Sequence, residues 1–259
     1  MKYDKAIPAL REGLMVIGAE ILRIRMNGWL AIVTKRDASD LQTAADRYSE
    51  KEVAGLLRRI FPGIGIWGEE GISEQVLAPL QAIVDPVDGT TPFAMGQDNF
   101  SISVGIEFLK NLLEAGFLYF PAQQKFVHAI YGEGAFIDGK RVDLPKGDLE
   151  LKDILVGFDF AAGSNRRAEL DDISGVAAAA LGLRIEGSFT GGVLKMLEGT
   201  WGAYVHLGAT PFDLAAAVVI AREAGFAISD TWNLGKEFSP VIFARTPALL
   251  DAIRPLTKI

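Results

Sequence analysis

Hydrophobic residues recur at helical spacing in the first part of the chain. Between positions 4 and 25 they step by four, three, four and three, at Leu10, Leu14, Ile17, Ile21 and Ile24. This spacing places the side chains on one face of a helix. A second helix is predicted over residues 43–60, where apolar residues recur in the same way until Pro62 and Gly63 end it.

Shorter apolar runs follow and predict strands. They lie at residues 64–67, 82–84, 101–106, 116–120 and 125–130. The run at 101–106 alternates polar and apolar residues, so the last three strands are expected to form an antiparallel meander. Its turns are predicted at Lys110-Asn111 and Pro121-Ala122.

Strands and helices alternate after a polar stretch at residues 145–153. Strands are predicted at 154–160, 183–186, 201–205, 226–229 and 241–244, and helices at 166–181, 191–198, 211–224 and from Thr246-Pro247 onward. We therefore expect an N-terminal α+β half, residues 1–144, and a C-terminal α/β half, residues 145–259. Neither repeats nor low-complexity segments occur, so the pattern favours layered helices and sheets.

Length and composition indicate a globular protein. With 259 residues and 49% hydrophobic content, the chain can bury a large core. Its apolar runs fall short of the roughly 20 residues of a membrane span. Charges interrupt the first 27 positions, so we expect neither a signal peptide nor a membrane anchor. A soluble protein of the cytoplasm is predicted.

The numbers of cysteine, histidine and acidic residues limit the kinds of active site that the chain can form. The absence of cysteine excludes disulfides, thiolate metal sites and cysteine nucleophiles. With His128 and His206 as the only histidines, a zinc site of several histidines is excluded and a Ser-His-Asp hydrolase is disfavoured. A net charge of −7 argues against a nucleic-acid partner. The 33 acidic residues favour Mg²⁺ held by oxygen ligands.

Residues 83–93 read IVDPVDGTTPF and predict a strand-to-helix corner. The strand ends at Val84, because Pro86 has no N–H to continue the ladder, and Gly89 allows a tight backbone path. Thr91 followed by a proline is typical of a helix start, with Thr91 as N-cap. Amide groups at such a start favour an anion.

Asp85 and Asp88 stand at this corner, three positions apart. Alone they would repel a phosphate group. With divalent cations between them and the phosphate, the arrangement becomes attractive, since carboxylates hold metal and metal holds phosphate oxygens. The alternative is that both are turn residues and that Thr91 is only a cap.

Further carboxylates occupy similar positions. Glu69 and Glu70 follow an apolar strand, and Asp46 and Asp213 lie in the first turn of predicted helices. Each of these two aspartates follows a threonine by three positions, as in a capping box, so helix capping explains them without a metal. Capping and metal binding are compatible, because a helix N-terminus keeps a carboxylate ionised.

Together these segments resemble the inositol monophosphatase family of magnesium-dependent, lithium-sensitive phosphatases. The matching motifs are GEE at 68–70, DPVDGTTPF at 85–93, GEGAFIDGKRV at 132–142 and PFDLAAAVVIAREAG at 211–225, in the same order as in the family. Pro92 and Phe212 replace an asparagine and a tryptophan of relatives, and keep the helix start and the apolar packing. The resemblance implies an α+β fold, a layered α-β-α-β-α sandwich of the sugar-phosphatase type, and a homodimer.

Carried onto matching positions, the resemblance implies two or three Mg²⁺ ions. Glu69, Asp85 and the main-chain carbonyl of Val87 would hold the first. Asp85, Asp88 and Asp213 would hold the second, and a weaker third site would include Glu69. One ion would lower the pKa of a bound water and another would neutralise the leaving alkoxide, without a covalent intermediate.

The resemblance also assigns catalytic and phosphate-binding roles. Thr90, together with Glu69, would orient and deprotonate the attacking water. Asp46 would accept a hydrogen bond from Thr90 and keep it polarised. The amides of Gly89, Thr90 and Thr91 would cradle the phosphate.

Substrate contacts are assigned to Asp88, Thr190, Gly191 and His206. His206 stands where relatives carry a glutamate that receives substrate hydroxyls. It could bind a hydroxyl or a second phosphate, or be a partly buried histidine at a strand end.

The predicted function is hydrolysis of a small polyol or sugar phosphate, with myo-inositol monophosphate first. Histidinol phosphate, fructose 1,6-bisphosphate and nucleotide 3′-phosphates remain open as substrates. A regulatory protein that uses the same fold to bind a macromolecule is the alternative of a different class.

Overall fold

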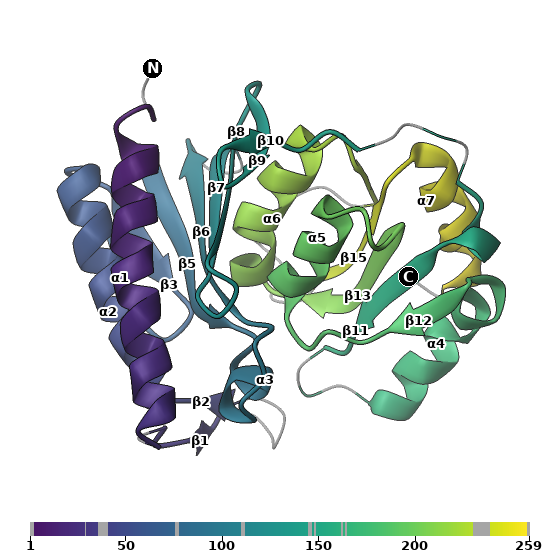
Figure 1. Cartoon of the computed structure of the whole chain (residues 1–259), viewed down its shortest axis with the longest axis horizontal. Helices are drawn as coiled ribbons and strands as arrows, with labels where there is room; N and C mark the ends of the chain where they lie inside the picture. The colour runs from purple at the N-terminus through teal and green to yellow at the C-terminus, as the bar shows by residue number, and fades with distance from the viewer. Residues whose placement is uncertain are drawn as a thin grey trace.

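Helices and sheets stack in five alternating layers (Figure 1). The computed structural model describes residues 3–28, 30–35, 41–75, 78–109, 112–144, 147, 149–161, 163, 165–229 and 239–257. The α-helices are α1 (Ala6–Met26), α2 (Ala44–Ile60), α3 (Thr90–Ala94), α4 (Arg166–Ala179), α5 (Phe189–Leu197), α6 (Pro211–Glu223) and α7 (Pro247–Ile253), and the 3-10 helices are Leu151–Asp153 and Arg254–Leu256. Within these ranges, no helix is both long enough and apolar enough to cross a membrane.

An eight-stranded sheet forms the second layer. Its order is β10 (Lys140–Arg141), β9 (Gly134–Ile137), β8 (Lys125–Ile130), β7 (Leu112–Phe120), β6 (Ser101–Phe108), β5 (Leu80–Asp88), β3 (Gly65–Gly68) and β4 (Ser73–Glu74). Neighbours are antiparallel except for β3 and β5, which run parallel. The meander expected from the alternating residues is thus confirmed. Helices α1 and α2 cover one face of this sheet, and α6 covers the other.

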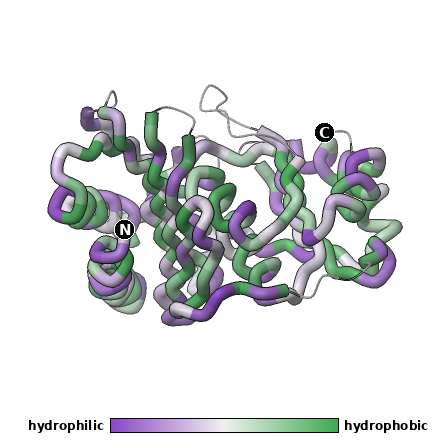
Figure 2. Tube along the Cα trace, turned by 90° about the horizontal axis from the view of Figure 1, so that it is seen from above, coloured by the Kyte–Doolittle hydropathy of each residue, from purple (hydrophilic) through white to green (hydrophobic). Residues whose placement is uncertain are grey.

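A five-stranded sheet forms the fourth layer. Its order is β12 (Gly182–Arg184), β11 (Leu155–Asp159), β13 (Ala203–Ala209), β15 (Ser239–Ala244) and β14 (Ala227–Ile228). Helices α5 and α6 lie between the two sheets, while α4 and α7 cover the outer face. A separate ribbon pairs β1 (Val33–Thr34) with β2 (Leu41–Gln42). Seen from above, the strands in the middle are mostly hydrophobic, whereas both kinds of position occur around the helices α1 and α2 (Figure 2). The predicted α-β-α-β-α sandwich is confirmed.

Several predicted boundaries need correction. Strand β5 does not end at Val84 but runs to Asp88, because pairing with β6 resumes after a register shift between Asp85 and Asp88. Helix α3 begins at Thr90, with Gly89 as N-cap, so Thr91 is not the cap. The turn predicted at Lys110-Asn111 lies outside the described residues, as do parts of the stretch 145–153.

Two glycines let α6 lie directly on the eight-stranded sheet. Gly105 and Gly116 are register partners on β6 and β7. A Cβ on Gly105 would lie 2.4 Å from the Cβ of Ala215, and one on Gly116 would lie 2.4 Å from the carbonyl oxygen of Ala216. The small residues on both surfaces therefore set the distance between α6 and the sheet.

Replacing Gly116 by alanine is expected to lower the free energy of unfolding by about 1–3 kcal/mol, because the added methyl group has no space beside α6. Urea denaturation measures the change. A suitable control is Gly55→Ala in α2, where the nearest atom to a new Cβ lies 3.7 Å away. Helical alanine is favoured over glycine, so this variant should gain about 0.5–1 kcal/mol. Equal stability of Gly116→Ala and the wild type would contradict the tight contact.

Candidate active site

The corner between β5 and α3 places two buried carboxylates side by side. Asp85 and Asp88 lie at the carboxyl end of β5, and each is 4% exposed. The Val87 amide donates to Asp85 Oδ1 over 3.0 Å and fixes that side chain. Gly89 then turns the chain with a φ of 85°. A side chain at Gly89 would also collide with Asn99 and Ser188 across the corner, since its Cβ would lie 2.8 Å from each.

Asp213 reaches the same place from the first turn of α6. It closes a capping box with Thr210, whose amide and hydroxyl donate to Asp213 Oδ2 over 2.6 and 2.8 Å. The predicted capping interpretation is therefore confirmed here. Asp85, Asp88 and Asp213 each present one oxygen such that these oxygens lie within 4.8 Å of one another. The capping bonds use Oδ2 of Asp213 and leave Oδ1 as a further acceptor.

The cluster is rich in negative charge. Burial, and then the charges of Glu69, Asp88 and Asp213, raises the pKa of Asp85 well above its ordinary value. Burial, followed by the charge of Asp88, raises the pKa of Asp213 to about 7. The charges of these carboxylates repel one another, and a set of hard oxygen donors suits Mg²⁺. The residues present therefore fit a divalent metal.

Glu69 lines the same pocket but is paired with a lysine. Lys35 Nζ lies 3.1 Å from Glu69 Oε1 and 2.5 Å from Glu70 Oε1. Gln42 also donates to Glu70, so the β1–β2 ribbon is fixed against the GEE motif. Glu69 is close enough to raise the pKa of Asp85. The sequence did not indicate Lys35 as a partner.

Thr90 and Asp46 meet at the edge of the cluster. The Thr90 hydroxyl lies 3.0 Å from Asp46 Oδ1 and 2.9 Å from the Val87 carbonyl oxygen. Asp46 also closes the capping box of α2, where Thr43 donates to Oδ2 from its amide and its hydroxyl over 2.8 and 2.5 Å. Burial raises the pKa of Asp46 to about 6, although the hydrogen bonds from Thr43 oppose this shift.

Asp88 is held by the start of α5. The Ser188 hydroxyl donates to Asp88 Oδ2 over 2.5 Å, the Phe189 and Thr190 amides donate over 3.0 and 2.9 Å, and the Thr190 hydroxyl also donates. These bonds partly offset the burial that raises the pKa of Asp88. Ser188 was not predicted. Its sequence signal is the N-cap that it forms by accepting from the Gly191 amide.

Thr190 and Gly191 do not fit the expected contact with a sugar. Both are buried, and neither lines the pocket. The Thr190 hydroxyl is engaged by Asp88 and lies 2.7 Å from the Ser101 hydroxyl. Thr190 therefore holds the Asp88 side chain through hydrogen bonds, and Gly191 does so indirectly through Ser188.

His206 lines the pocket from within β13, not from a strand end. Burial, and then the charge of Arg166, lowers the pKa of His206 to about 3, so the ring is neutral at pH 7. The Gly208 amide donates to Nδ1 over 3.2 Å, which places the ring proton on Nε2. Phe189 packs against the ring with its centroid 5.4 Å away. His206 is thus a fixed, uncharged donor.

Asp159 is a pocket residue that the sequence did not reveal. It accepts from the Glu186 and Gly187 amides over 3.1 and 2.6 Å and from the Tyr204 hydroxyl over 2.9 Å. Burial raises its pKa to about 7. These bonds fix the turn before Ser188. No local motif surrounds Asp159, and its partners lie 27 to 45 positions away.

One pocket collects residues from both halves of the chain. Its volume is about 280 Å³, near the lower end of small-molecule pockets. Asp85, Asp88, Asp213 and Glu69 all line it, and so do Gly89, Thr90 and Thr91. Arg166 and Phe160 stand among the remaining lining residues. A small phosphorylated molecule suits this size and charge.

Comparison with known proteins agrees with this geometry. The sequence profile of the inositol monophosphatase family matches residues 6–242. Inositol-1-monophosphatase of Bacillus subtilis is 30% identical, over 80% of this chain and 78% of its own. Nus factor SuhB of Pseudomonas aeruginosa is 29% identical, over 76% of this chain and 75% of its own. The crystal structure of the extragenic suppressor protein suhB from Bartonella henselae has the same fold, with a TM-score of 0.88 and 24% identity, covering 98% of this chain and 99% of that chain. The resemblance based on the motifs is thereby confirmed, and the chain belongs to the inositol monophosphatase family.

Proposed function

We propose that this protein is a magnesium-dependent phosphomonoesterase that hydrolyses a small phosphorylated polyol or sugar. The supporting observation is the convergence of Asp85, Asp88 and Asp213 beside the pair of Thr90 and Asp46 in one pocket. The family and the named relative from Bacillus subtilis make myo-inositol monophosphate the first candidate substrate.

The proposed ligands of two or three Mg²⁺ ions are Glu69, Asp85, the Val87 carbonyl, Asp88 and Asp213. When bound, magnesium would neutralise phosphate charge and make a coordinated water acidic. Ser188 and the first amides of α5 keep Asp88 oriented for this role. The Thr210 cap does the same for Asp213.

Thr90 is the proposed group that orients the attacking water, together with Glu69. A hydroxyl has one proton, and Thr90 has two acceptors, Asp46 and the Val87 carbonyl. When the Thr90 hydroxyl donates to Asp46, the lone pairs of its oxygen are left to accept a hydrogen bond from the attacking water. If the proton of that water moves to Thr90, the hydroxyl proton of Thr90 moves to Asp46. The amides of Gly89, Thr90 and Thr91 are the proposed phosphate cradle.

A screen for phosphate release tests the function. Myo-inositol monophosphate, histidinol phosphate, fructose 1,6-bisphosphate and a nucleotide 3′-phosphate are each incubated with the protein, with Mg²⁺ and with EDTA. We expect at least one substrate to release phosphate, and EDTA to lower the rate by more than about 1,000-fold, because several kcal/mol of charge stabilisation disappear. No release from any phosphomonoester would contradict the proposal and favour the regulatory binding role. The relative from Pseudomonas aeruginosa is named a Nus factor, and this name is the reason for considering the binding role.

A homodimer and inhibition by lithium, which the family resemblance implies, stay predictions. The cytoplasmic location, which was predicted from the charges in the first 27 positions, stays a prediction too. Sedimentation velocity measures the oligomeric state. Adding LiCl to the same phosphate-release assay measures the inhibition by lithium.

A further inference from the structure

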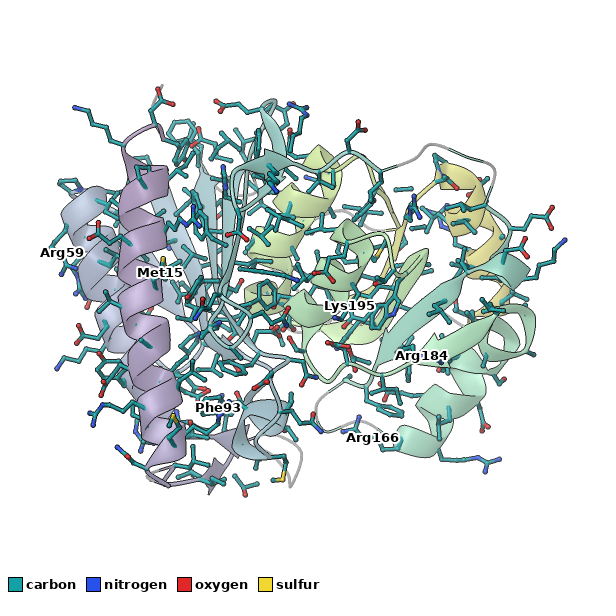
Figure 3. The ribbon with its side chains drawn as sticks, viewed as in Figure 1. Met15, Arg59, Phe93, Arg166, Arg184 and Lys195 are labelled. Carbon is teal, nitrogen blue, oxygen red and sulfur yellow. The ribbon has the colours of Figure 1, made fainter. Side chains whose placement is uncertain are left out.

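Among the residues that the structure describes, one cationic side chain lines the pocket. Among the described lining residues, Arg166 is the only lysine or arginine, and five carboxylates accompany it: Glu69, Asp85, Asp88, Asp159 and Asp213. Three of these carboxylates, Asp85, Asp88 and Asp213, lie close together in the cluster described above. Arg166 belongs to another element, as the first residue of α4, and is exposed. Figure 3 shows it at the beginning of that helix, on the side nearer to α3. The pocket therefore has a cation from an element that contributes nothing to the acidic cluster.

The fold does not require this arginine. In the described part of the chain, Arg166 forms no ion pair, whereas the adjacent Arg167 pairs with Asp171 over 3.3 Å. Helix N-termini favour acidic side chains, so a first-turn arginine gives α4 no electrostatic benefit. The cap of this helix is the Asn165 side chain, which accepts from the amides of Arg167 and Ala168. Arg166 is thus available to a ligand.

An aromatic ring keeps the guanidinium in place. The Arg166 Cζ atom lies 4.4 Å from the centroid of the Phe160 ring, which also lines the pocket. Phe158 packs edge-on against Phe160 at 4.9 Å. This contact restricts the guanidinium while leaving its N–H groups to donate, and the planar group can match two oxygens of a phosphate. Arg166 is therefore suited to an anion.

His206 contributes a further hydrogen-bond donor to the same pocket. Burial lowers the pKa of His206, and the charge of Arg166 lowers it further. His206 is neutral and carries its proton on Nε2, because Nδ1 accepts from Gly208. Both side chains line the pocket. A neutral hydroxyl would satisfy His206 alone, but it would leave the charge of Arg166 without a counterpart.

We propose that Arg166 binds a second phosphate group, on the part of the substrate remote from the phosphate that is cleaved, and so selects sugar or polyol bisphosphates over monophosphates. This inference rests on the proposed phosphatase activity. It adds a specificity residue outside the metal cluster and makes no claim about the chemical step.

Fructose 1,6-bisphosphate and fructose 1-phosphate provide the test, because they differ only in the second phosphate. The values of kcat/KM are measured with Mg²⁺ for both substrates, and the product of the first is identified as fructose 6-phosphate. The wild type should prefer the bisphosphate. Arg166→Ala should lower kcat/KM for the bisphosphate about 10- to 100-fold, mostly through KM, and for the monophosphate less than about threefold. Arg166→Lys should recover only part of the loss, since it cannot bind a phosphate through two parallel bonds.

Arg167→Ala is the matched control, because it removes the neighbouring charge on the same helix without touching the pocket. It should leave both substrates unchanged. Equal losses for both substrates in Arg166→Ala, or no loss for either, would overturn the inference, as would a wild type that prefers fructose 1-phosphate. A wild type that releases phosphate from neither substrate, nor from the other phosphomonoesters, would instead overturn the proposed activity. The activity toward fructose 1-phosphate also verifies that each variant is folded.

Discussion

An Asp85→Asn variant is expected to lose phosphatase activity by more than about 1,000-fold while remaining folded. Burial, and then the charges of Glu69, Asp88 and Asp213, raises the pKa of Asp85, so this carboxylate interacts with all the other proposed acidic ligands. Losing one charged ligand should remove about 4 kcal/mol of transition-state stabilisation, which corresponds to three orders of magnitude in rate. Initial rates of phosphate release at saturating Mg²⁺ measure the effect.

The same substitution, Asp85→Asn, should not lower the stability of the metal-free protein. Without metal, the substitution removes a buried charge beside like charges, and the asparagine oxygen can still accept from the Val87 amide. The free energy of unfolding in EDTA should therefore equal or exceed that of the wild type. At a 100-fold excess over its dissociation constant, Mg²⁺ should raise the melting temperature of the wild type by about 5–10 °C, and that of the variant far less.

The control for this comparison is Asp251→Asn, which replaces an exposed aspartate on α7. It should keep both the activity and the response to Mg²⁺. If Asp85→Asn retained near-normal turnover, the three carboxylates would not be the metal site. If it simply unfolded in EDTA, the repulsion described above would be wrong.

A Thr90→Val variant is expected to lower kcat about 100- to 1,000-fold, with a smaller change in KM. Valine has nearly the same shape as threonine but cannot relay a proton, and a positioned acid or base contributes about 100- to 10,000-fold. The side chain contacts Asp46 and the Val87 carbonyl through its hydroxyl, so only this function is removed. Steady-state kinetics with the substrate found in the screen provides kcat and KM.

Thr90→Ser restores the hydroxyl and should stay within about tenfold of the wild type. The rise in melting temperature on adding Mg²⁺ should persist in Thr90→Val, because the proposed metal ligands are unchanged. A Thr90→Val enzyme with normal kcat would show that the hydroxyl does not take part in the reaction. A lost metal response would assign Thr90 to metal binding instead.

Local signals allowed the main elements and four of the acidic residues to be predicted. The threonine-to-aspartate spacing of the capping box marked the starts of α2 and α6, and it fixed Asp46 and Asp213 in their first turns. Asp85 and Asp88 were located by the strand before them and the glycine after them. These features depend on neighbours within a few residues, so a sequence contains them directly.

Other features depend on contacts that a sequence pattern does not contain. Strand β5 continues past Pro86 because Asp88 pairs with Ser101 on β6. Ser188 meets Asp88 across 100 positions. Arg166 enters the pocket only because α4 follows β11 in the second sheet. Thr190 was placed near the right region, but its burial behind Asp88 could not be seen without the tertiary fold.

The contact between α6 and the eight-stranded sheet has a consequence for how variation at these positions would be interpreted. Gly105, Gly116, Ala215 and Ala216 touch no substrate, yet their small size determines where Asp213 stands relative to Asp85. If a library of random variants were screened for loss of activity, the inactive variants would therefore include bulky replacements at these four positions as well as changes at the acidic residues. An assay that measures folding separately from turnover would be needed to distinguish a packing defect from the loss of a catalytic group.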